Sequence, residues 1–212
     1  MKIRLGTRPS RLARVQAREI AARWPQCRFD PVFIETPGDR DKETPLGGRE
    51  GGDFFTRDLE EALRRGVIDA AVHSAKDVED EPPEDLVLAA LTPSISPFEC
   101  LIAAGPYTLG SLPKGAVVGT SSRRRRDAVA RLRPDVVIKD IRGNIEERLA
   151  QLDKGAFDAF VSAHAAFLRL GLTHRISELF PLDVMEPHPL QGRLCIQVRR
   201  DRKDLIRFFG EQ

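Results

Sequence analysis

The chain has 212 residues, of which 41% are hydrophobic and 31% are charged, and its formal net charge is +2. This composition can fill one large core or two smaller ones, and it excludes a disordered chain and a strongly basic polyanion-binding protein. No apolar run approaches the ~20 residues of a membrane-spanning helix, and the N-terminal residues lack the apolar core of a signal peptide. We therefore expect a cytoplasmic protein with no membrane partner.

The elements expected in chain order alternate between strand and helix, the pattern of an α/β protein. A strand over 2–6, a helix from about Ser10, and a strand over 29–35 come first. A polar, mobile loop over 36–53 precedes a helix over 57–65 that is capped by Thr56 and ended by Gly66. Further strands are expected at 67–73, 86–91, 99–104, 116–119, 136–141, 157–161 and 194–198, and further helices at 122–132, 145–154 and 164–170.

Two passages repeat in the same order. The Gly-Thr pair that starts 6–11 recurs at 119–123, each time between a strand and a helix. The segment 63–72 matches 152–161 at the same Leu, Gly, Asp, Ala and Val positions. The repeat predicts two doubly wound α/β domains around a central cleft, with ligands beyond the carboxyl ends of the strands.

Both repeats open a helix with hydroxyl side chains, and a helix N-terminus favours bound anions. Arginines accompany each of these starts, and 27 of the 34 basic residues are arginine, whose planar fork suits carboxylate or phosphate. The candidates are Arg8 and Ser10 at the first start, and Thr120, Ser121, Ser122 and the run Arg123–Arg126 at the second. The alternatives are serines that only cap helices and an arginine run that is a solvated face or a nucleic-acid patch, although nucleic acid is disfavoured because no aromatic residues interrupt the run.

Two further corners carry charge that could act on a ligand. Lys76 and Asp77 follow the strand 67–73, where the lysine could hold an anion and the carboxylate could transfer protons. The alternative there is a surface ion pair. Arg142, Gly143 and Arg148 form a second cationic corner, in which the glycine lets both arginines face one ligand. No metal site is expected, because the cysteines and histidines show no ligand spacing.

The motifs HSAKD at 73–77, GTSSRRRR at 119–126 and RGN at 142–144 together resemble the porphobilinogen deaminase (hydroxymethylbilane synthase) family. The resemblance covers nearly the whole chain in the family's order. It implies two domains of the type II periplasmic-binding-protein kind around the cleft: a first domain over 1–92 completed by the returning segment 190–212, and a second domain over 93–189.

The resemblance also implies an activity of tetrapyrrole biosynthesis. Members of the family condense four porphobilinogen units into hydroxymethylbilane on a dipyrromethane primer, releasing ammonia at each addition. Asp77 matches the catalytic aspartate. The residues that match the binders of acetate and propionate groups are Arg8, Ser10, Lys76, Thr120, Ser121, Ser122, Arg124, Arg125, Arg142, Gly143, Arg148 and Arg169.

Departures from the family pattern leave three readings open. Gly52-Asp53 stands where the family has a lysine, and the family's third domain, with the cysteine that anchors dipyrromethane, is expected to be absent. The first reading is an unusually short deaminase, acting either as it stands or completed by a third domain on a separate polypeptide. The second is a paralogue that binds a pyrrole or another small polycarboxylate without polymerising it, and the third is a partner- or nucleic-acid-binding module.

The three cysteines bear on how a primer could be held. Cys195 is expected near the cleft, where neighbouring arginines would lower the pKa of its thiol. The apolar, alternating strand around Cys195 instead favours a buried, inert thiol. We therefore expect that dipyrromethane is not covalently bound to this chain.

Overall fold

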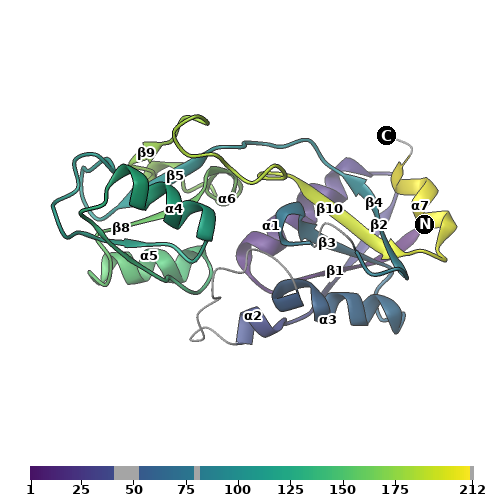
Figure 1. The fold of residues 1–212 in the computed structure, drawn as a ribbon. Helices are drawn as coiled ribbons and strands as arrows, with labels where there is room; N and C mark the ends of the chain where they lie inside the picture. Colours follow the sequence, from purple (N-terminus) through teal and green to yellow (C-terminus); the bar gives the residue numbers. More distant parts are fainter. Residues whose placement is uncertain (41–52, 79–81, 211–212) are drawn as a thin grey trace. The chain divides into compact units, whose positions relative to one another are not determined.

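A computed structural model describes residues 1–40, 53–78 and 82–210, with only the backbone of Asp53, and divides them into two compact units (Figure 1). Unit 1 holds the described residues up to Ile95 together with those from Gly192 onward, and unit 2 runs from Ser96 to Gln191. Each unit is built around its own five-stranded mixed sheet. The α/β class with two related units, as expected from the repeat, is confirmed.

Unit 1 begins and ends with segments that pair in one sheet of order β2-β1-β3-β10-β4. The first three strands of that order are parallel, and β10 runs antiparallel to both of its neighbours. Its elements are β1 (Lys2–Thr7), α1 (Arg11–Arg23), β2 (Arg28–Phe33), α2 (Pro37–Arg40), α3 (Asp53–Arg64), β3 (Ala70–Ser74), the 3-10 helix η1 (Ala75–Asp77), β4 (Leu86–Leu91), β10 (Leu194–Arg199) and α7 (Lys203–Gly210).

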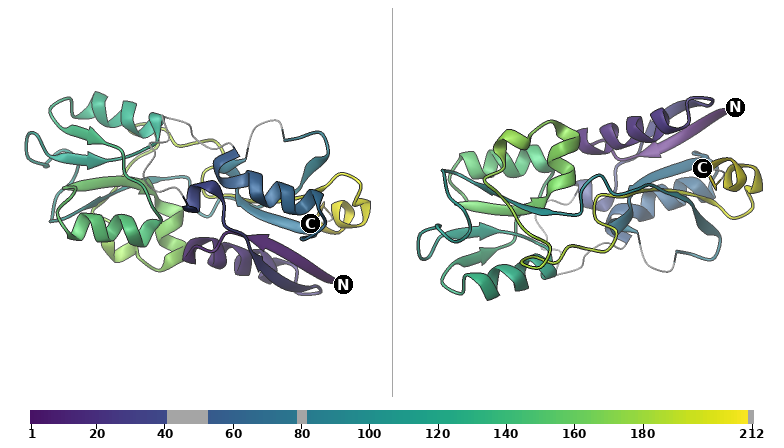
Figure 2. Two further views of the ribbon diagram at one scale, coloured as in Figure 1. Left: turned by 90° about the horizontal axis from the view of Figure 1, so that it is seen from below. Right: turned by 90° about the horizontal axis from the view of Figure 1, so that it is seen from above.

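The unit 1 sheet is covered on both faces. On one face α1 and α7 pack together through Trp24 and Phe209, whose ring centroids lie 5.3 Å apart, against Ile196 of β10. On the other face α3 places Leu59 and Leu63 against the sheet. Figure 2 shows α1 and α3 on opposite sides of this sheet. Because both faces are buried, strands β3 and β10 are almost wholly inaccessible to solvent.

Unit 2 has a sheet of order β7-β6-β8-β5-β9 in which β6, β7 and β8 are parallel and β5 is antiparallel to both of its neighbours. The buried residues of α4 pack on one face, and Figure 2 shows α5 on the other. Its elements are β5 (Glu99–Ala103), β6 (Val117–Gly119), α4 (Arg123–Leu132), β7 (Val137–Lys139), α5 (Ile145–Asp153), β8 (Ala159–Ala163), α6 (His164–Leu170), the 3-10 helix η2 (Thr173–Arg175) and β9 (Glu178–Leu179).

The repeated segment 63–72/152–161 forms the same local structure in both units. Gly66 and Gly155 end their helices with φ of +65° and +74°, a conformation that favours glycine. Asp69 then accepts a hydrogen bond from the backbone N–H of Arg4 at 2.9 Å. Asp158 accepts the equivalent bond from Val117 at 2.7 Å. Each aspartate therefore ties the segment after a helix to the start of the parallel strand beside it.

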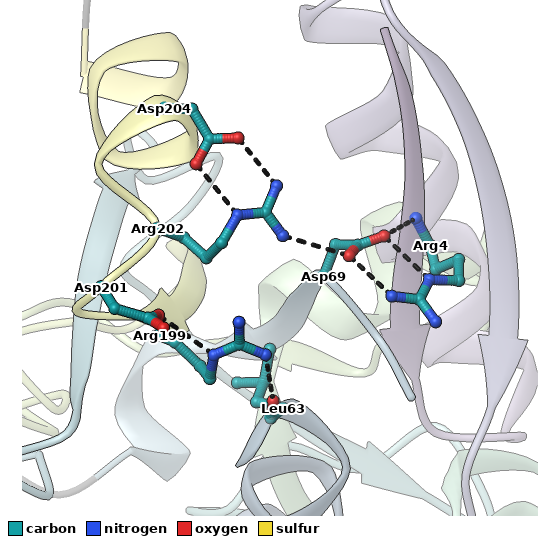
Figure 3. Close-up of polar contacts among 7 residues, drawn as sticks. All are labelled: Arg4, Leu63, Asp69, Arg199, Asp201, Arg202 and Asp204. Atoms are coloured by element: carbon teal, nitrogen blue, oxygen red, sulfur yellow. Dashed lines mark hydrogen bonds and ion pairs between the residues drawn. The ribbon is translucent and has the colours of Figure 1, made fainter. Parts of the chain in front are cut away.

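Arginine side chains connect the C-terminal segment, from β10 to α7, to the rest of unit 1 (Figure 3). Arg202 donates to Asp204 of α7 and to Asp69, which also binds the Arg4 guanidinium through both carboxylate oxygens. Arg199 donates to Asp201 and to the carbonyl of Leu63 at the end of α3. These contacts join β1, β3, β10, α3 and α7 at one end of the unit.

Several element boundaries differ from those expected. Helix α3 begins at Asp53 rather than 57, so Thr56 lies inside the helix and the prediction of a cap there was wrong. Residues 37–40 form the short helix α2 instead of loop, while 41–52, including the Gly52 departure, lie outside the described residues. Strand β3 begins at Ala70 rather than 67, because residues 67–69 complete the turn after Gly66. Neither β9 nor α7 was expected.

Candidate catalytic and anion-binding site

The first candidate cluster lies at the carboxyl ends of β1 and β3, which are parallel neighbours and therefore end at one edge of the sheet. At the end of β1 a Cβ on Gly6 would collide with Ile68 Cδ1 and lie 3.1 Å from Leu59 Cδ2, so a larger residue would displace these two buried side chains. Ser10 then caps α1 by accepting a hydrogen bond from the Ala13 N–H at 3.3 Å. Because α1 begins directly after β1, its N-terminus lies at this edge, and no acidic residue in its first turn offsets the partial positive charge there.

Arg8 is held in one orientation by two groups that the sequence did not reveal. Its Nε and Nη2 donate to the carboxylate of Asp39 in α2, and its guanidinium lies 4.4 Å from the ring centroid of Phe55 in α3. Burial alone raises the pKa of Asp39, but the hydrogen bonds and charge of Arg8 and the donors of Thr36 outweigh burial and lower that pKa. Asp39 is therefore a fixed anion, and Arg8 is a fixed cation at the strand edge.

The turn Ser74–Asp77 stands at the same edge of unit 1. It consists of the end of β3 and the 3-10 helix η1, and it is fastened from two sides. The Ala75 N–H donates to the carbonyl of Arg193, and Gln16 of α1 donates to the Ser74 hydroxyl at 2.9 Å. The side chains that follow, Lys76 and Asp77, are half-buried. Arg8, Ser10, Lys76 and Asp77 are thus all placed by the ends of two adjacent strands.

The second candidate cluster lies at the carboxyl ends of β6, β7 and β8 in unit 2. After β6, Ser122 caps α4 by accepting a hydrogen bond from the Arg125 N–H at 3.4 Å, and Thr120 is buried. Ser121 both accepts from the N–H of Ile141 and donates to its carbonyl, so its hydroxyl joins the loops after β6 and β7. Both repeat serines, Ser10 and Ser122, therefore cap helices, and both caps lie at a strand edge.

The run of four arginines is divided by the helix period. Arg123 is 81% exposed, as expected for a solvated face. Arg125 points into unit 2, where its Nη2 lies 2.9 Å from a carboxylate oxygen of Glu99, a residue that is also buried. Arg126 donates to Asp140 and to the Thr120 carbonyl. Arg124 is half-buried at the start of the helix, so the four side chains do not form one cationic face.

The corner after β7 is rigid. Gly143 has φ of +97°, and Asn144 caps α5 with a reciprocal pair of hydrogen bonds to Glu147. Arg148 donates from Nε to the Gly143 carbonyl at 2.9 Å, and Gln151 donates to the Arg142 carbonyl at 3.0 Å. Arg142 and Arg148 are half-buried, as is Arg169 on α6, the helix that starts directly after β8. Because β6 lies between β7 and β8, these arginines and the serines of α4 share one edge of unit 2.

The three cysteine thiols are shielded from solvent. All three are buried, and burial raises the pKa of both Cys100 and Cys195 to about 12 and raises that of Cys27. The expectation that Cys195 is buried is confirmed, and its pKa is raised rather than lowered as in the alternative. Within 1–40, 53–78 and 82–210 no group of three His, Cys, Asp or Glu side chains could hold a metal ion.

Sequence reasoning missed Asp39, Phe55, Gln16 and Glu99, which support the candidate residues from other elements. None of the four lies in a motif with them, and only the folded chain brings each to its partner. No local signal in the sequence marks these contacts.

Each of the two α/β units has a capped helix and arginines at the ends of its parallel strands. This arrangement is that of the periplasmic-binding-protein fold. An ancestral arginine-binding protein, solved with arginine bound, matches with a TM-score of 0.55 at 16% identity, covering 99% of this chain and 89% of that one. The fold class expected from the sequence is confirmed. The helices of the described part of the chain include none that is long and apolar enough to cross a membrane.

The chain belongs to the porphobilinogen deaminase family. The family model described as "Porphobilinogen deaminase, dipyromethane cofactor binding domain" matches residues 3–207. A porphobilinogen deaminase of Nitratiruptor sp. is 39% identical over 216 residues, which cover 100% of this chain and 70% of the relative. Another from Legionella pneumophila (strain Paris) is 40% identical over 203 residues, 94% of this chain and 66% of the relative. The resemblance to a family of transferases in tetrapyrrole biosynthesis is thereby confirmed, and the chain spans about two thirds of the length of such relatives.

Proposed function

We propose that this protein is a hydroxymethylbilane synthase-type transferase, which condenses porphobilinogen units and releases ammonia at each addition. The observation that carries the proposal is the half-buried Asp77 carboxylate on a fastened turn at the same sheet edge as Arg8, Ser10 and Lys76. That edge joins a proton-transferring group to carboxylate-binding groups, which a pyrrole substrate with two carboxylates requires. The free thiols are consistent with a cytoplasmic location.

In this proposal Asp77 is the catalytic residue. Its carboxylate accepts hydrogen bonds from pyrrole N–H groups and handles the proton as the aminomethyl group leaves as ammonia. Loss of ammonia leaves a cationic azafulvene, and a nearby fixed negative charge stabilises that cation. Lys76 and Arg8 bind substrate carboxylates beside it, with the N-terminus of α1 behind Ser10 as a further anion-binding group.

The cluster of unit 2 binds the carboxylates of the growing chain. Ser121 and Ser122 present hydroxyls and the N-terminus of α4, and Thr120 lies at the end of β6. Arg124, Arg142, Arg148 and Arg169 supply cations at that edge, with Gly143 setting the turn between two of them. Arg125 acts through its ion pair with Glu99, which anchors the first turn of α4 to β5.

Taken by itself, each cluster has donors that fit the carboxylates of dipyrromethane, the cofactor in the description of the matched domain. Two linked pyrroles carry four carboxylates, and arginine forks and helix N-termini are the groups that bind carboxylates in proteins. The cofactor supplies the free pyrrole position on which the product chain grows. We propose that none of the three cysteines of this chain anchors it, because all are buried and burial raises the pKa of Cys100 and Cys195 to about 12.

Intact mass spectrometry of the purified chain tests the attachment. The expected mass is that of the unmodified 212 residues, and Ehrlich's reagent should give no colour with the denatured protein. An added mass of two linked pyrroles that disappears in Cys195→Ser would show that Cys195 is the anchor and would refute this part of the proposal.

Porphobilinogen consumption with ammonia release tests the function itself. The expected result is turnover by the parent chain and none by Asp77→Asn. Binding of porphobilinogen without turnover, even with added dipyrromethane, would refute a deaminase complete in itself. It would favour a non-polymerising paralogue, or a deaminase that needs a separate polypeptide, and co-purification from the source cell would distinguish the two.

A further inference from the structure

A chain of three buried polar side chains crosses the core of unit 1 directly behind the turn Ser74–Asp77. The ring Nε2 of His73 lies 3.1 Å from Gln197 Oε1, and Gln197 Nε2 donates to Glu60 Oε1 at 3.1 Å. His73 is 5%, Gln197 0% and Glu60 6% exposed, and they belong to β3, β10 and α3 respectively. Burying three polar side chains costs free energy unless their hydrogen-bonding groups pair with one another. Packing alone therefore does not explain why these three side chains occupy the core.

The Glu60 carboxylate determines which group donates and which accepts in each hydrogen bond from Glu60 through Gln197 to His73. Glu60 accepts hydrogen bonds, so the Gln197 amide turns its N–H2 toward Glu60 and its oxygen toward His73. His73 must then donate from Nε2, which leaves Nδ1 unprotonated. Burial, opposed by the Gln197 hydrogen bond and aided by the charge of Arg8, lowers the pKa of His73 to about 4, so the ring is neutral at physiological pH. One tautomer and one ring orientation are therefore selected.

The same strand that carries Gln197 also fastens the catalytic turn. Cys195 of β10 stands opposite His73 in the sheet, and the carbonyl of Arg193 accepts the Ala75 N–H. The negative charge of Asp77, after burial, contributes to the raised pKa of Cys195. Helix α3 supplies Glu60 at one end of the chain and places Phe55 over Arg8. A displacement of His73, Gln197 or Glu60 would therefore move the turn Ser74–Asp77, from which the Asp77 side chain projects.

We propose that Glu60, Gln197 and His73 are positioning residues, which hold the end of β3 so that Asp77 and Lys76 meet the substrate in a reactive geometry. This inference rests on the function proposed above. None of the three is required to touch the substrate, because their hydrogen bonds connect α3, β10 and β3 inside the core.

The test compares Gln197→Met, which keeps the side-chain volume but breaks both hydrogen bonds, with Glu60→Gln, which keeps an acceptor for Gln197. The matched control is Leu205→Ala in α7, a fully buried residue on the opposite face of the sheet. At a temperature where all variants are folded by circular dichroism, Gln197→Met should lower kcat about 10- to 100-fold with a smaller change in KM, because a misplaced catalytic group lowers the rate of the bound state. Glu60→Gln should retain most of kcat, and Leu205→Ala should match the parent.

Amide hydrogen exchange gives a readout that does not depend on turnover. The Ala75 N–H should exchange about 3- to 10-fold faster in Gln197→Met than in Leu205→Ala, the change expected from loosening one buried hydrogen bond. If Gln197→Met does not fold, Gln197→Asn shortens the same side chain and replaces it. Equal kcat and equal Ala75 exchange in the broken variant and the control would overturn the inference. A parent without turnover would refute the proposed function alone, and the exchange comparison would still decide the positioning role.

Discussion

Removing the negative charge of Asp69 should destabilise unit 1 by an amount that depends on pH. Asp69 accepts from the Arg4 backbone, binds the Arg4 guanidinium at 2.8 and 3.0 Å, and accepts from Arg202 at 3.2 Å (Figure 3). Asp69→Asn keeps one acceptor for the backbone N–H and loses the charge that attracts two arginines. Because these arginines lie on β1 and just before α7, the loss should weaken the attachment of the C-terminal segment.

The pKa of Asp69 sets the magnitude. The hydrogen bonds and charge of Arg4, together with the hydrogen bond from Arg202, outweigh the opposing effect of burial and lower it from 3.8 to about 2. One pKa unit corresponds to about 1.4 kcal/mol, so the full shift would correspond to about 2.5 kcal/mol of stability. The Asp69 side chain is 15% exposed but that of Arg4 is 46% exposed, and solvent screening reduces the expected loss to about 1–2 kcal/mol at neutral pH.

The pH dependence follows from the sign of the shift. A carboxyl whose pKa is lower in the folded state stabilises fully above its unfolded pKa, near 4, and loses that contribution as the pH falls toward about 2. Urea unfolding followed by Trp24 fluorescence measures this, because Trp24 is the only tryptophan and is buried in unit 1 against Phe209. The gap between parent and variant should be constant above pH about 5 and should shrink toward pH about 2.

Asp85→Asn is the matched control, because Asp85 also binds an arginine, Arg64, through both oxygens but is 53% exposed. That variant should cost at most about 0.5 kcal/mol. If Asp69→Asn costs no more than Asp85→Asn, or if its cost does not depend on pH, the cluster in Figure 3 does not stabilise the unit through charge.

Three further predictions concern the site. Asp77→Asn should fold as the parent does and lower single-turnover ammonia release by at least ~100-fold, and a variant within a few-fold of the parent would remove Asp77 from catalysis. Arg142→Lys should weaken calorimetric binding of porphobilinogen nearly as much as Arg142→Ala, by about 2–5 kcal/mol, and parent-like binding by the lysine variant would reduce the contact to long-range charge. Glu99→Ala removes the carboxylate beside the buried Arg125 and should destabilise unit 2 by about 3–5 kcal/mol in thermal unfolding. Replacing Glu99 and Arg125 together by the apolar residues Met and Leu should recover most of that loss of stability.

The elements that the sequence predicted correctly are those with local causes. The segments 63–72 and 152–161 were recognisable because each needs a glycine at positive φ and an aspartate at one fixed position to tie a helix end to a strand. Helix α5 began at its expected residue and α4 began one residue later than expected, because Asn144 and Ser122 are caps, whose effect is confined to one helical turn.

The errors arose where a distant contact decides the structure. Thr56 has the chemistry of a cap, but α3 continues in front of it through Phe54 and Phe55, and Phe55 packs on Arg8. Strand β9 has two residues and exists only because β5 pairs with it. Helix α7 carries the apolar residues Leu205 and Phe209 at helical spacing, a signal that could have been found.

The residues of the candidate site also fall into two groups, those with a local sequence signal and those held by distant contacts. The strand-end motifs around Ser10, Asp77 and Ser122 were visible because the site residues follow the strands directly. The support behind them was not visible, since His73 and Gln197 are 124 positions apart in the sequence and Gln197 and Glu60 are 137 apart. Helix spacing could have placed Arg125 on the buried face with Ala128 and Val129, but it could not have named Glu99 as the partner.

The place of β10 within its sheet has a consequence for how the chain folds as it is synthesised. Strand β10 lies between β3 and β4, so β4 joins its sheet only after residues 194–199 have been made. The described part of unit 2 is continuous from 96 to 191, so it is fully synthesised before β10 of unit 1 has been made. We therefore expect unit 2 to fold while the sheet of unit 1 is still incomplete. In that state the backbone N–H and C=O groups along β3 and β4 that later pair with β10 are exposed. Until β10 is made, these strand edges are the part of the nascent chain most open to aggregation and to chaperone binding.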